Sequence, residues 1–339
     1  MRAPTPATFS HPDWTRAISA HVLGWTKVQV PPTGVPRLSG MLRKKHWPVT
    51  HYDTWLTPLT PTGLPAAGLP PGADDALALL ESTESPILFR NLKLEHPVTQ
   101  ALLTAATHQK TIKTWVRAGL NLAGSYDDWL MANFDQKRRK ELKRLRTRLG
   151  EQGKLESITL DCKGDLEPFL QAFLALEAKS WKGKRGSAVA NDTQMQKALA
   201  AGLHAMHAAG RVKFWQINFD GQPIASLFAL VDDGEVTLGK IAHDDAFAKS
   251  SPGVLIILDA TASLFGQPGL TLADSNAMPG HPMIDRIWRD RIACVDVLLA
   301  GPSTPSPIFQ LLSLFIGTQF AAKDKTKRVL AQWTGRKTS

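Results

Sequence analysis

Three strand-like segments joined by two tight turns, and followed directly by an apolar helix, constrain the fold of this chain most strongly. RVKFWQINF (211–219) and QPIASLFALV (222–231) flank Asp220-Gly221, a pair that favours a two-residue hairpin turn. Asp232-Asp233-Gly234 makes the next turn, into EVTLGKIAH (235–243). The pattern predicts an antiparallel meander whose third strand leads into the helical segment SSPGVLIILDATASLF (250–265).

The segments on either side of the meander extend the same α/β pattern. Before it we predict a strand at 154–160 and helices at 165–181 and 193–210, and after it strands at 270–274 and 293–299 with a short helix around 282–290. Residues 1–72 are rich in proline and favour short strands and loops. They are followed by helices at 74–81 and 97–109 and strands at 84–92 and 111–119, with no chemical motif.

A strongly basic segment connects the two parts. One long helix is predicted from Tyr126 to Gln152, and KRRKELKRLRTR (137–148) within it carries eight basic residues, while leucines at helical spacing predict one apolar face. A solvated helix face is favoured over a nucleic-acid site, because Phe134 is the only aromatic residue nearby that could stack on a base.

Composition limits the classes of function. A length of 339 residues suggests two domains or one large one, and a net charge of +10 favours anionic partners. Cys162 and Cys294 are too few for a disulfide framework or a four-cysteine metal site, so we expect a cytoplasmic protein without metal. The apolar segment 308–322 is too short and polar to span a bilayer. Packing onto the domain is favoured for it over peripheral contact with an anionic membrane.

The start of the helix at 250–265 is a candidate phosphate site. A helix N-terminus has unpaired amides and partial positive charge, Pro252 gives up no donor that is needed, Gly253 lets a ligand approach the backbone, and Lys249 adds a cation. Plain capping of the helix explains the same residues when they are taken alone.

Five stretches in this order resemble the GNAT acyltransferase fold: FDQKRRKELKRLRTRLGEQGKL, FLALEAKSWKGKRGSA, GQPIASLFAL, KIAHDDAFAKSSPGVLI and LADSNAMPGHPMIDRIW. More narrowly, the chain resembles the acetyltransferase-domain family linked to bacterial cellulose biosynthesis (CelD-like), a relative of the FemAB transferases. The resemblance covers about residues 130–295. It departs from the usual pattern where Pro252 and Val254 replace loop glycines, and where Ile284 and Asp285 replace the Tyr-Lys of relatives.

The resemblance implies a GNAT-like mixed sheet flanked by helices, built as two tandem halves. The domains would be a degenerate first half at 1–125, a basic connecting helix at 126–152, the acyltransferase domain at 153–300 and a helical tail at 301–339. It also implies an acyl-CoA co-substrate, acetyl-CoA or another, with its pyrophosphate on the helix N-terminus and its pantetheine arm between two splayed strands. The predicted cofactor contacts are Ile241, Ala242, Lys249, Ser250, Ser251, Gly253 and Val254.

Two side chains at strand ends are the predicted catalytic residues. His243 would take a proton from the acceptor amine, since a histidine titrates near neutral pH, and Asp274 would orient the acceptor. A solvated loop histidine and a turn cap are the alternative readings. Strand alternation places Val236, Leu238 and Lys240 on one face of the strand and His243 on the other.

The acceptor side is predicted to be lined by Glu177, Trp181 and Lys182. The sequence supports equally well a purely structural role, in which Glu177 is a structural residue beside a packed Trp181. Overall the sequence favours an acyl-CoA-dependent N-acyltransferase for an unknown amine. The alternatives are a FemAB-like transferase that uses an aminoacyl-tRNA, with the basic helix gripping RNA, and a non-catalytic scaffold for envelope-polysaccharide synthesis.

Overall fold

One continuous sheet of ten strands forms the centre of the protein. The computed structural model describes residues 9, 11–21, 41–46, 49–54, 56–60, 73–81, 83, 85–160, 164–180, 189–232 and 234–333. The sheet order is β1-β2-β3-β10-β4-β9-β8-β7-β6-β5. The strands are β1 (Met41–His46), β2 (Val49–Thr54), β3 (Ile87–Lys93), β4 (His108–Asn121), β5 (Leu155–Leu160), β6 (Val212–Phe219), β7 (Gln222–Asp232), β8 (Glu235–His243), β9 (Leu272–Asp274) and β10 (Asp290–Ala300).

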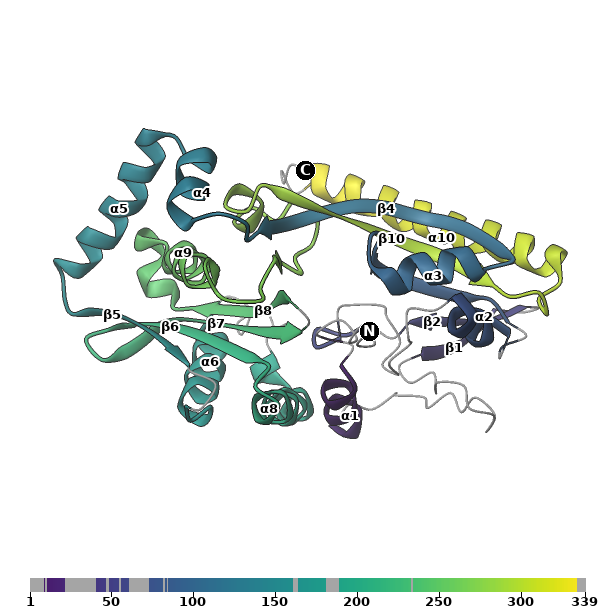
Figure 1. Ribbon diagram of the computed structural model, residues 1–339, viewed down its shortest axis with the longest axis horizontal. Coiled ribbons are helices and arrows are strands. Elements are labelled where there is room, and N and C mark those ends of the chain that lie inside the picture. Colours follow the sequence, from purple (N-terminus) through teal and green to yellow (C-terminus); the bar gives the residue numbers. More distant parts are fainter. Residues whose placement is uncertain are drawn as a thin grey trace.

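The predicted meander is confirmed. β5, β6, β7 and β8 pair antiparallel in sequence order, and β8 then pairs in parallel with β9. α9 (Pro252–Leu264) covers one face of these strands, while α6 (Glu167–Lys179) and α8 (Thr193–Ala208) cover the other, as Figure 1 shows. The α/β class with a large mixed sheet flanked by helices therefore agrees with the sequence.

The two halves of the sheet exchange strands at its centre. β10, from the end of the chain, lies between β3 and β4, and β4 lies between β10 and β9, all in antiparallel pairs. In the order β3-β10-β4-β9, strands of the first half alternate with strands of the second half. This alternation fits two tandem GNAT-like units. A domain boundary after residue 125 would place β4 in the first domain and its partner strands β9 and β10 in the second.

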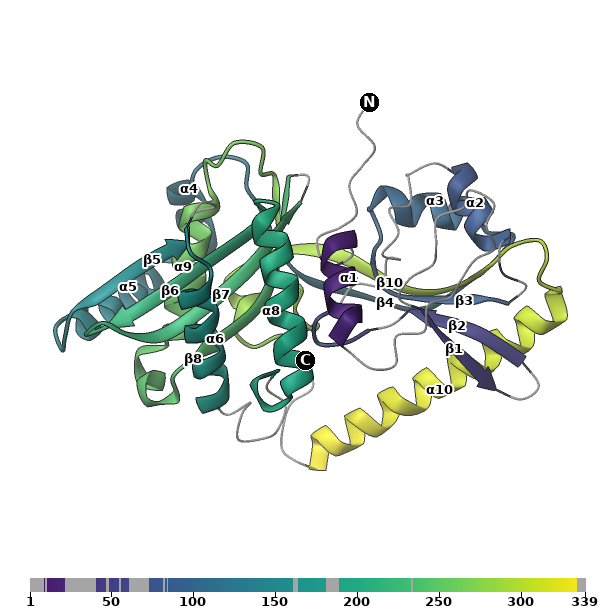
Figure 2. The same ribbon diagram turned by 90° about the horizontal axis from the view of Figure 1, so that it is seen from below.

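Helices also cover both faces of the first half. α2 (Ala73–Glu81) and α3 (Pro97–Ala105) pack on one face, and the long α10 (Ser306–Trp333) runs along the other (Figure 2). α1 (Pro12–His21), in a segment where loops and strands were expected, packs instead against α8 of the second half. A Cβ at Gly202 would lie 2.8 Å from the Trp14 ring, so the glycine makes this contact possible. Among the described residues, no helix is both long and apolar enough to cross a membrane.

The single long helix predicted from Tyr126 to Gln152 is wrong. The segment forms α4 (Tyr126–Asn133) and α5 (Gln136–Gly150), separated by Phe134 and Asp135 in extended conformation. The Asp135 side chain accepts a hydrogen bond from the Arg138 amide at 2.7 Å and so caps a new helix. The short elements are the 3₁₀ turns η2 (Val189–Asn191), η3 (Asp245–Ser250) and η4 (Ile284–Arg286); η4 replaces the predicted helix at 282–290.

Candidate active site

The parallel strands β8 and β9 separate after a short paired stretch. Only Glu235–Thr237 of β8 pair with Leu272–Asp274 of β9, whereas β8 continues to His243. The Asn276 side chain adds one more link, because its Nδ2 donates to the Leu238 carbonyl at 3.3 Å. Beyond Leu238 the strands diverge, and β8 presents an edge that no described strand covers.

A β-bulge shapes β8 where this opening begins. The register between β7 and β8 shifts between Leu227 and Ala229, opposite Gly239 and Lys240. A Cβ on Gly239 would lie 2.0 Å from a ring carbon of Phe228, so the ring closes over the glycine and a larger residue would displace it. A glycine inside a strand pattern often marks such a bulge. Gly239 could therefore have indicated the bulge from the sequence, where regular alternation was predicted instead.

The bulge makes the predicted strand alternation wrong for Lys240. Val236 and Leu238 pack in the core on the α9 side, but Lys240 lies on the α6 side, where its Nζ is 3.4 Å from Glu177 Oε1. One extra residue on the bulged strand reverses the faces of all residues that follow. Glu177 is fully buried on α6 and so pairs with Lys240. Trp181 and Lys182, the other predicted acceptor-side residues, lie outside the described residues.

The backbone of β8 points toward the opening at two residues. The Asp244 amide donates to the Ile224 carbonyl at 2.9 Å, so the backbone N–H and C=O groups of Asp244 face β7. Because these groups alternate along a strand, those of Ala242 face β7 as well. Those of Ile241 and His243 face the other way, toward the opening. Of the two residues of β8 predicted to contact the cofactor, Ile241 and Ala242, Ile241 therefore has the better orientation.

His243 lies against the start of α9. A Cβ on Gly253 would sit 3.4 Å from His243 Nδ1 and 3.3 Å from Met283 Sδ, so the glycine lets the imidazole and the helix terminus approach closely. The structure thus brings together the predicted base and the predicted phosphate site. In this position His243 can contact a cofactor as well as an acceptor.

The turn before α9 uses some of the predicted donors internally. Ser251 has a left-handed backbone (φ 51°), its amide bonds to the Ala248 carbonyl, and the amides of Val254 and Leu255 both bond to the Ser251 carbonyl. The Ser251 side chain makes no capping bond, and Lys249 is exposed. A phosphate would therefore rely on Lys249, the two serine hydroxyls and the close approach that Gly253 permits.

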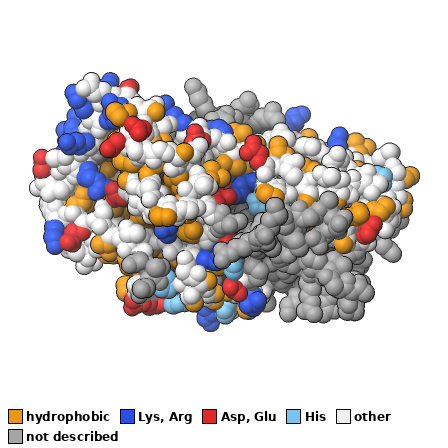
Figure 3. Space-filling model, viewed as in Figure 1, with side chains coloured by type: hydrophobic (Ala, Val, Ile, Leu, Met, Phe, Trp, Pro, Cys, Tyr) orange, Lys and Arg blue, Asp and Glu red, His pale blue; other side chains and the backbone are white. Residues whose placement is uncertain are grey.

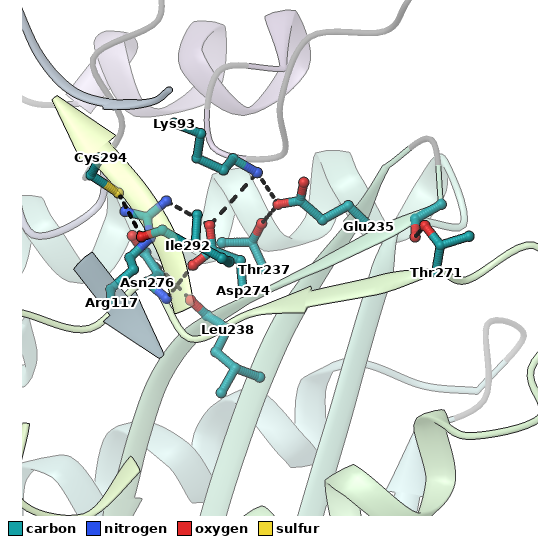
Figure 4. Close-up of polar contacts among 11 residues, drawn as sticks. Lys93, Arg117, Glu235, Thr237, Leu238, Thr271, Asp274, Asn276, Ile292 and Cys294 are labelled. Carbon is teal, nitrogen blue, oxygen red and sulfur yellow. Dashed lines mark hydrogen bonds and ion pairs between the residues drawn. The ribbon is translucent and has the colours of Figure 1, made fainter. Parts of the chain in front are cut away.

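Asp274 is the centre of a buried polar network (Figure 4). It is fully buried, its Oδ2 lies 2.5 Å from an Arg117 guanidinium nitrogen and 3.6 Å from Lys93 Nζ, and its Oδ1 accepts the Asn276 amide at 2.8 Å. Lys93 also pairs with Glu235, which accepts a 3.0 Å bond from Thr237. Lys93 and Arg117 come from the first half and the two carboxylates from the second, so the network ties the halves together.

Charges in this network shift two pKa values. Burial is the largest effect on the pKa of Arg117 and lowers it, but Asp274, Cys294 and Glu235 together outweigh burial. The pKa of Arg117 is therefore raised, and the guanidinium stays charged. Burial raises the pKa of the Cys294 thiol to about 11 even though Arg117 opposes the shift, so the thiol is neutral at physiological pH. Sequence reasoning missed Lys93, Arg117 and Asn276, because a lone charge in a strand does not reveal its partner in another half of the chain.

Comparisons with known proteins agree with this geometry. Residues 136–274 match the family model of the acetyltransferase (GNAT) domain. The chain carries a GNAT-type domain. The match spans less than half of the chain, and it ends at Asp274, so it contains the meander, the splayed strand and α9. No curated protein matches the sequence.

Solved structures resemble nearly the whole chain. FemX is 11% identical, with 88% of this chain and 93% of that chain covered at a TM-score of 0.52. A conserved protein of unknown function from Bacteroides thetaiotaomicron reaches 0.48 at 11% identity, covering 87% and 91%. L-PGS from Bacillus licheniformis reaches 0.43 at 9% identity, covering 89% and 96%. The likeness to FemX supports the fold of both halves together.

Among the described residues, no group of three or more His, Cys, Asp or Glu side chains is arranged to hold a metal ion.

Proposed function

We propose that the protein is an acyl-CoA-dependent N-acyltransferase of the cytoplasm, in the CelD-like group that the sequence resembles. The observation that carries this proposal is the opening between β8 and β9, which begins at the Gly239 bulge and leads to the N-terminus of α9. An extended thioester arm fits along the edge of β8 that no described strand covers, with its phosphates at the positive end of the helix.

In the proposed reaction the acceptor amine attacks the thioester carbonyl carbon. The new C–N bond forms as the C–S bond breaks, coenzyme A leaves as the thiolate, and the amine proton passes to His243 directly or through water. The backbone amides of Ile241 and His243 face the opening and would stabilise the negative charge that develops on the carbonyl oxygen. No tyrosine occurs in the second half to protonate the thiolate, but coenzyme A thiolate is a fair leaving group near neutral pH and does not require a general acid.

Isothermal titration calorimetry with acetyl-CoA tests the cofactor site. Lys249→Glu should weaken binding at least about tenfold, because a charge-assisted contact contributes about 1.5–3 kcal/mol and the substitution reverses its sign. Lys197→Glu, an exposed lysine of α8, is the matched control and should bind like the wild type. If Lys249→Glu and Lys197→Glu bind acetyl-CoA equally well, Lys249 does not contact the cofactor. If the wild type does not bind acetyl-CoA, the acyl-CoA proposal is rejected.

The second candidate is transfer from an aminoacyl-tRNA, which the resemblance to FemAB transferases implies. The observation that favours it is the exposed basic surface of α5, where Lys and Arg side chains gather at the upper left of Figure 3. The exposed members are Lys137, Lys140, Lys143, Arg144 and Arg148. A scaffold in polysaccharide synthesis would bind neither ligand.

The other three arginines of α5 have structural partners. Arg146 pairs with Asp259 of α9, Arg139 donates to the Phe134 carbonyl, and Arg138 lies 2.7 Å from Glu141. The prediction that the basic segment is only a solvated face is therefore wrong for Arg146 and Arg139, which hold α5 against its neighbours.

Replacing Lys140, Lys143 and Arg144 by glutamine should leave acetyl-CoA turnover nearly unchanged, because these side chains are exposed. If tRNA is the donor, the same variant should lose binding in a gel-shift assay. The slope of the logarithm of the tRNA binding constant against the logarithm of salt concentration should also become shallower. The change is about two to three if three phosphate contacts are lost. Equal gel shifts for wild type and variant would reject the RNA role of α5.

The tail helix α10 is proposed as a peripheral membrane contact. Ile308, Leu311, Leu314 and Phe315 are exposed on it, and exposed lysines follow at 323 and 325. Vesicles containing phosphatidylglycerol should therefore cosediment the protein more than neutral phosphatidylcholine vesicles. Leu311→Ser with Leu314→Ser should reduce that binding about tenfold or more, since each leucine buried contributes about 1.5–3 kcal/mol. Equal sedimentation with both lipids would contradict the proposal.

A further inference from the structure

A buried ion pair lies under the strand that borders the opening, and the proposed reaction does not use it. Glu177 of α6 is fully buried, and its Oε1 lies 3.4 Å from Nζ of Lys240 on β8, whose side chain is 17% exposed. Figure 1 shows α6 on the face of the sheet opposite α9. The pair therefore joins α6 to β8 from the side of the sheet away from the helix of the candidate phosphate site.

The surroundings of the pair are apolar. Phe173 and Leu176 of α6 belong to the buried core on this face of the sheet, together with Phe228 of β7. A carboxylate or an ammonium in such surroundings is unfavourable unless an opposite charge is held beside it. Among the described residues, Glu177 is the acid that pairs with Lys240, so each of the two charges stabilises the burial of the other.

The bulge in β8 decides which face of the sheet Lys240 occupies. Gly239 and Lys240 together stand opposite the single residue Phe228, and the Phe228 ring and the Lys240 side chain lie on the α6 face. In a strand without the bulge, Lys240 would share the face of Leu238, which packs in the core on the α9 side. An unpaired ammonium in that core is unfavourable, so the pair with Glu177 favours the bulged register over the regular one.

The bulge also reverses the direction of the backbone groups along β8. The Leu238 carbonyl faces β9, where it accepts from Asn276, whereas the Asp244 amide, an even number of residues further along, faces β7. In a regular strand, residues at an even separation face the same neighbour, because the groups alternate with a period of two. Without the bulge, the amides of Ile241 and His243 would therefore face β7 instead of the opening.

We propose that Glu177 is a positioning residue for acyl transfer. By pairing with Lys240 it stabilises the bulged register of β8, which aims the amides of Ile241 and His243 at the thioester carbonyl. The inference rests on the proposed function, since the carbonyl oxygen is the group that these amides would stabilise. Glu177 acts through the strand and needs no contact with either substrate.

Hydrogen–deuterium exchange followed by NMR tests the strand without any substrate. The amides of Ala242 and Asp244, which face β7, should exchange at least about tenfold faster in Glu177→Gln and in Lys240→Met, because each change leaves a charge without its partner. Lys240→Arg keeps the positive charge and should exchange like the wild type. Glu167→Gln, at an exposed acid of the same helix, is the matched control. Unchanged exchange in both Glu177→Gln and Lys240→Met overturns the proposal.

Kinetics measured well below the unfolding temperature separate positioning from stability alone. Glu177→Gln and Lys240→Met should each lower kcat at least about tenfold, while KM for acetyl-CoA stays within about threefold, because misdirected amides weaken the transition state more than the bound arm.

The double variant Glu177→Gln with Lys240→Met leaves neither charge of the pair in place. It should regain stability but not kcat, because no buried charge then disfavours the regular strand. Recovery of kcat together with stability would mean that the pair is only structural and overturns the proposal. If the wild type does not turn over acetyl-CoA, the proposed function is rejected, whereas unchanged exchange rejects the role of Glu177 alone.

Discussion

Replacing Arg117 by leucine should lower the free energy of unfolding by about 3–5 kcal/mol, because it leaves the Asp274 carboxylate buried without its main partner. Arg117 is 1% exposed and Asp274 0%, so water does not replace the lost guanidinium. Lys93 remains 3.6 Å from Asp274 but already pairs with Glu235, so it compensates only in part. Urea denaturation followed by circular dichroism measures the change.

An exposed ion pair of the same type is the control for this experiment. Arg138 and Glu141 lie 2.7 Å apart on α5, with both side chains more than 40% exposed, and Arg138→Leu should cost less than about 1 kcal/mol. The double variant Arg117→Leu with Asp274→Asn should recover part of the loss, since no unpaired charge then stays buried. A cost for Arg117→Leu as small as that for Arg138→Leu would mean that Asp274 is not held as a buried anion.

Replacing His243 by alanine should lower kcat by about 100- to 10,000-fold, the usual contribution of a general base. The rate is measured as thiol release from acetyl-CoA with an amine found by screening primary amines. The pH–rate profile of the wild type should show a limb that the variant lacks. His243→Gln keeps the size and polarity of the side chain without the basic nitrogen, and should be as slow as the alanine variant.

The position of His243 beside Gly253 makes acyl-CoA affinity the deciding second readout. If His243 is the base, the dissociation constant for acetyl-CoA should change little while kcat falls. If the affinity falls instead and kcat at saturation stays within about threefold of the wild type, the imidazole holds the cofactor, and the proton goes to another group or to water.

Kinetics and acetyl-CoA affinity of Asp274→Asn distinguish an acceptor-orienting role of Asp274 from a positioning role. If Asp274 orients the acceptor, Asp274→Asn should mainly raise the acceptor KM. Its burial beneath Arg117 and Asn276 favours instead a positioning role, in which it holds the end of β9 and thus the width of the opening. In that case Asp274→Asn should lower stability together with the affinity for acetyl-CoA.

Local patterns in the sequence were enough for much of the second half. Alternating residues between Asp-Gly turns defined β6, β7 and β8, and the run from Ser250 predicted α9, because these signals depend only on neighbours along the chain. They also placed His243 and Gly253 near one end of one strand, which is the part of the candidate site that the structure brings together.

Tertiary structure alone decided the features that depend on distant residues. Nothing local indicates that β10 inserts between β3 and β4, since strand pairing over some 200 residues is set by how the whole core packs. The bulge in β8 places Gly239 under the ring of Phe228 on the neighbouring strand β7, where a Cβ would not fit, and it moves Lys240 to the face of Glu177. The Asp274 network needs cations from the other half, because a buried carboxylate is stable only where a partner is brought to it.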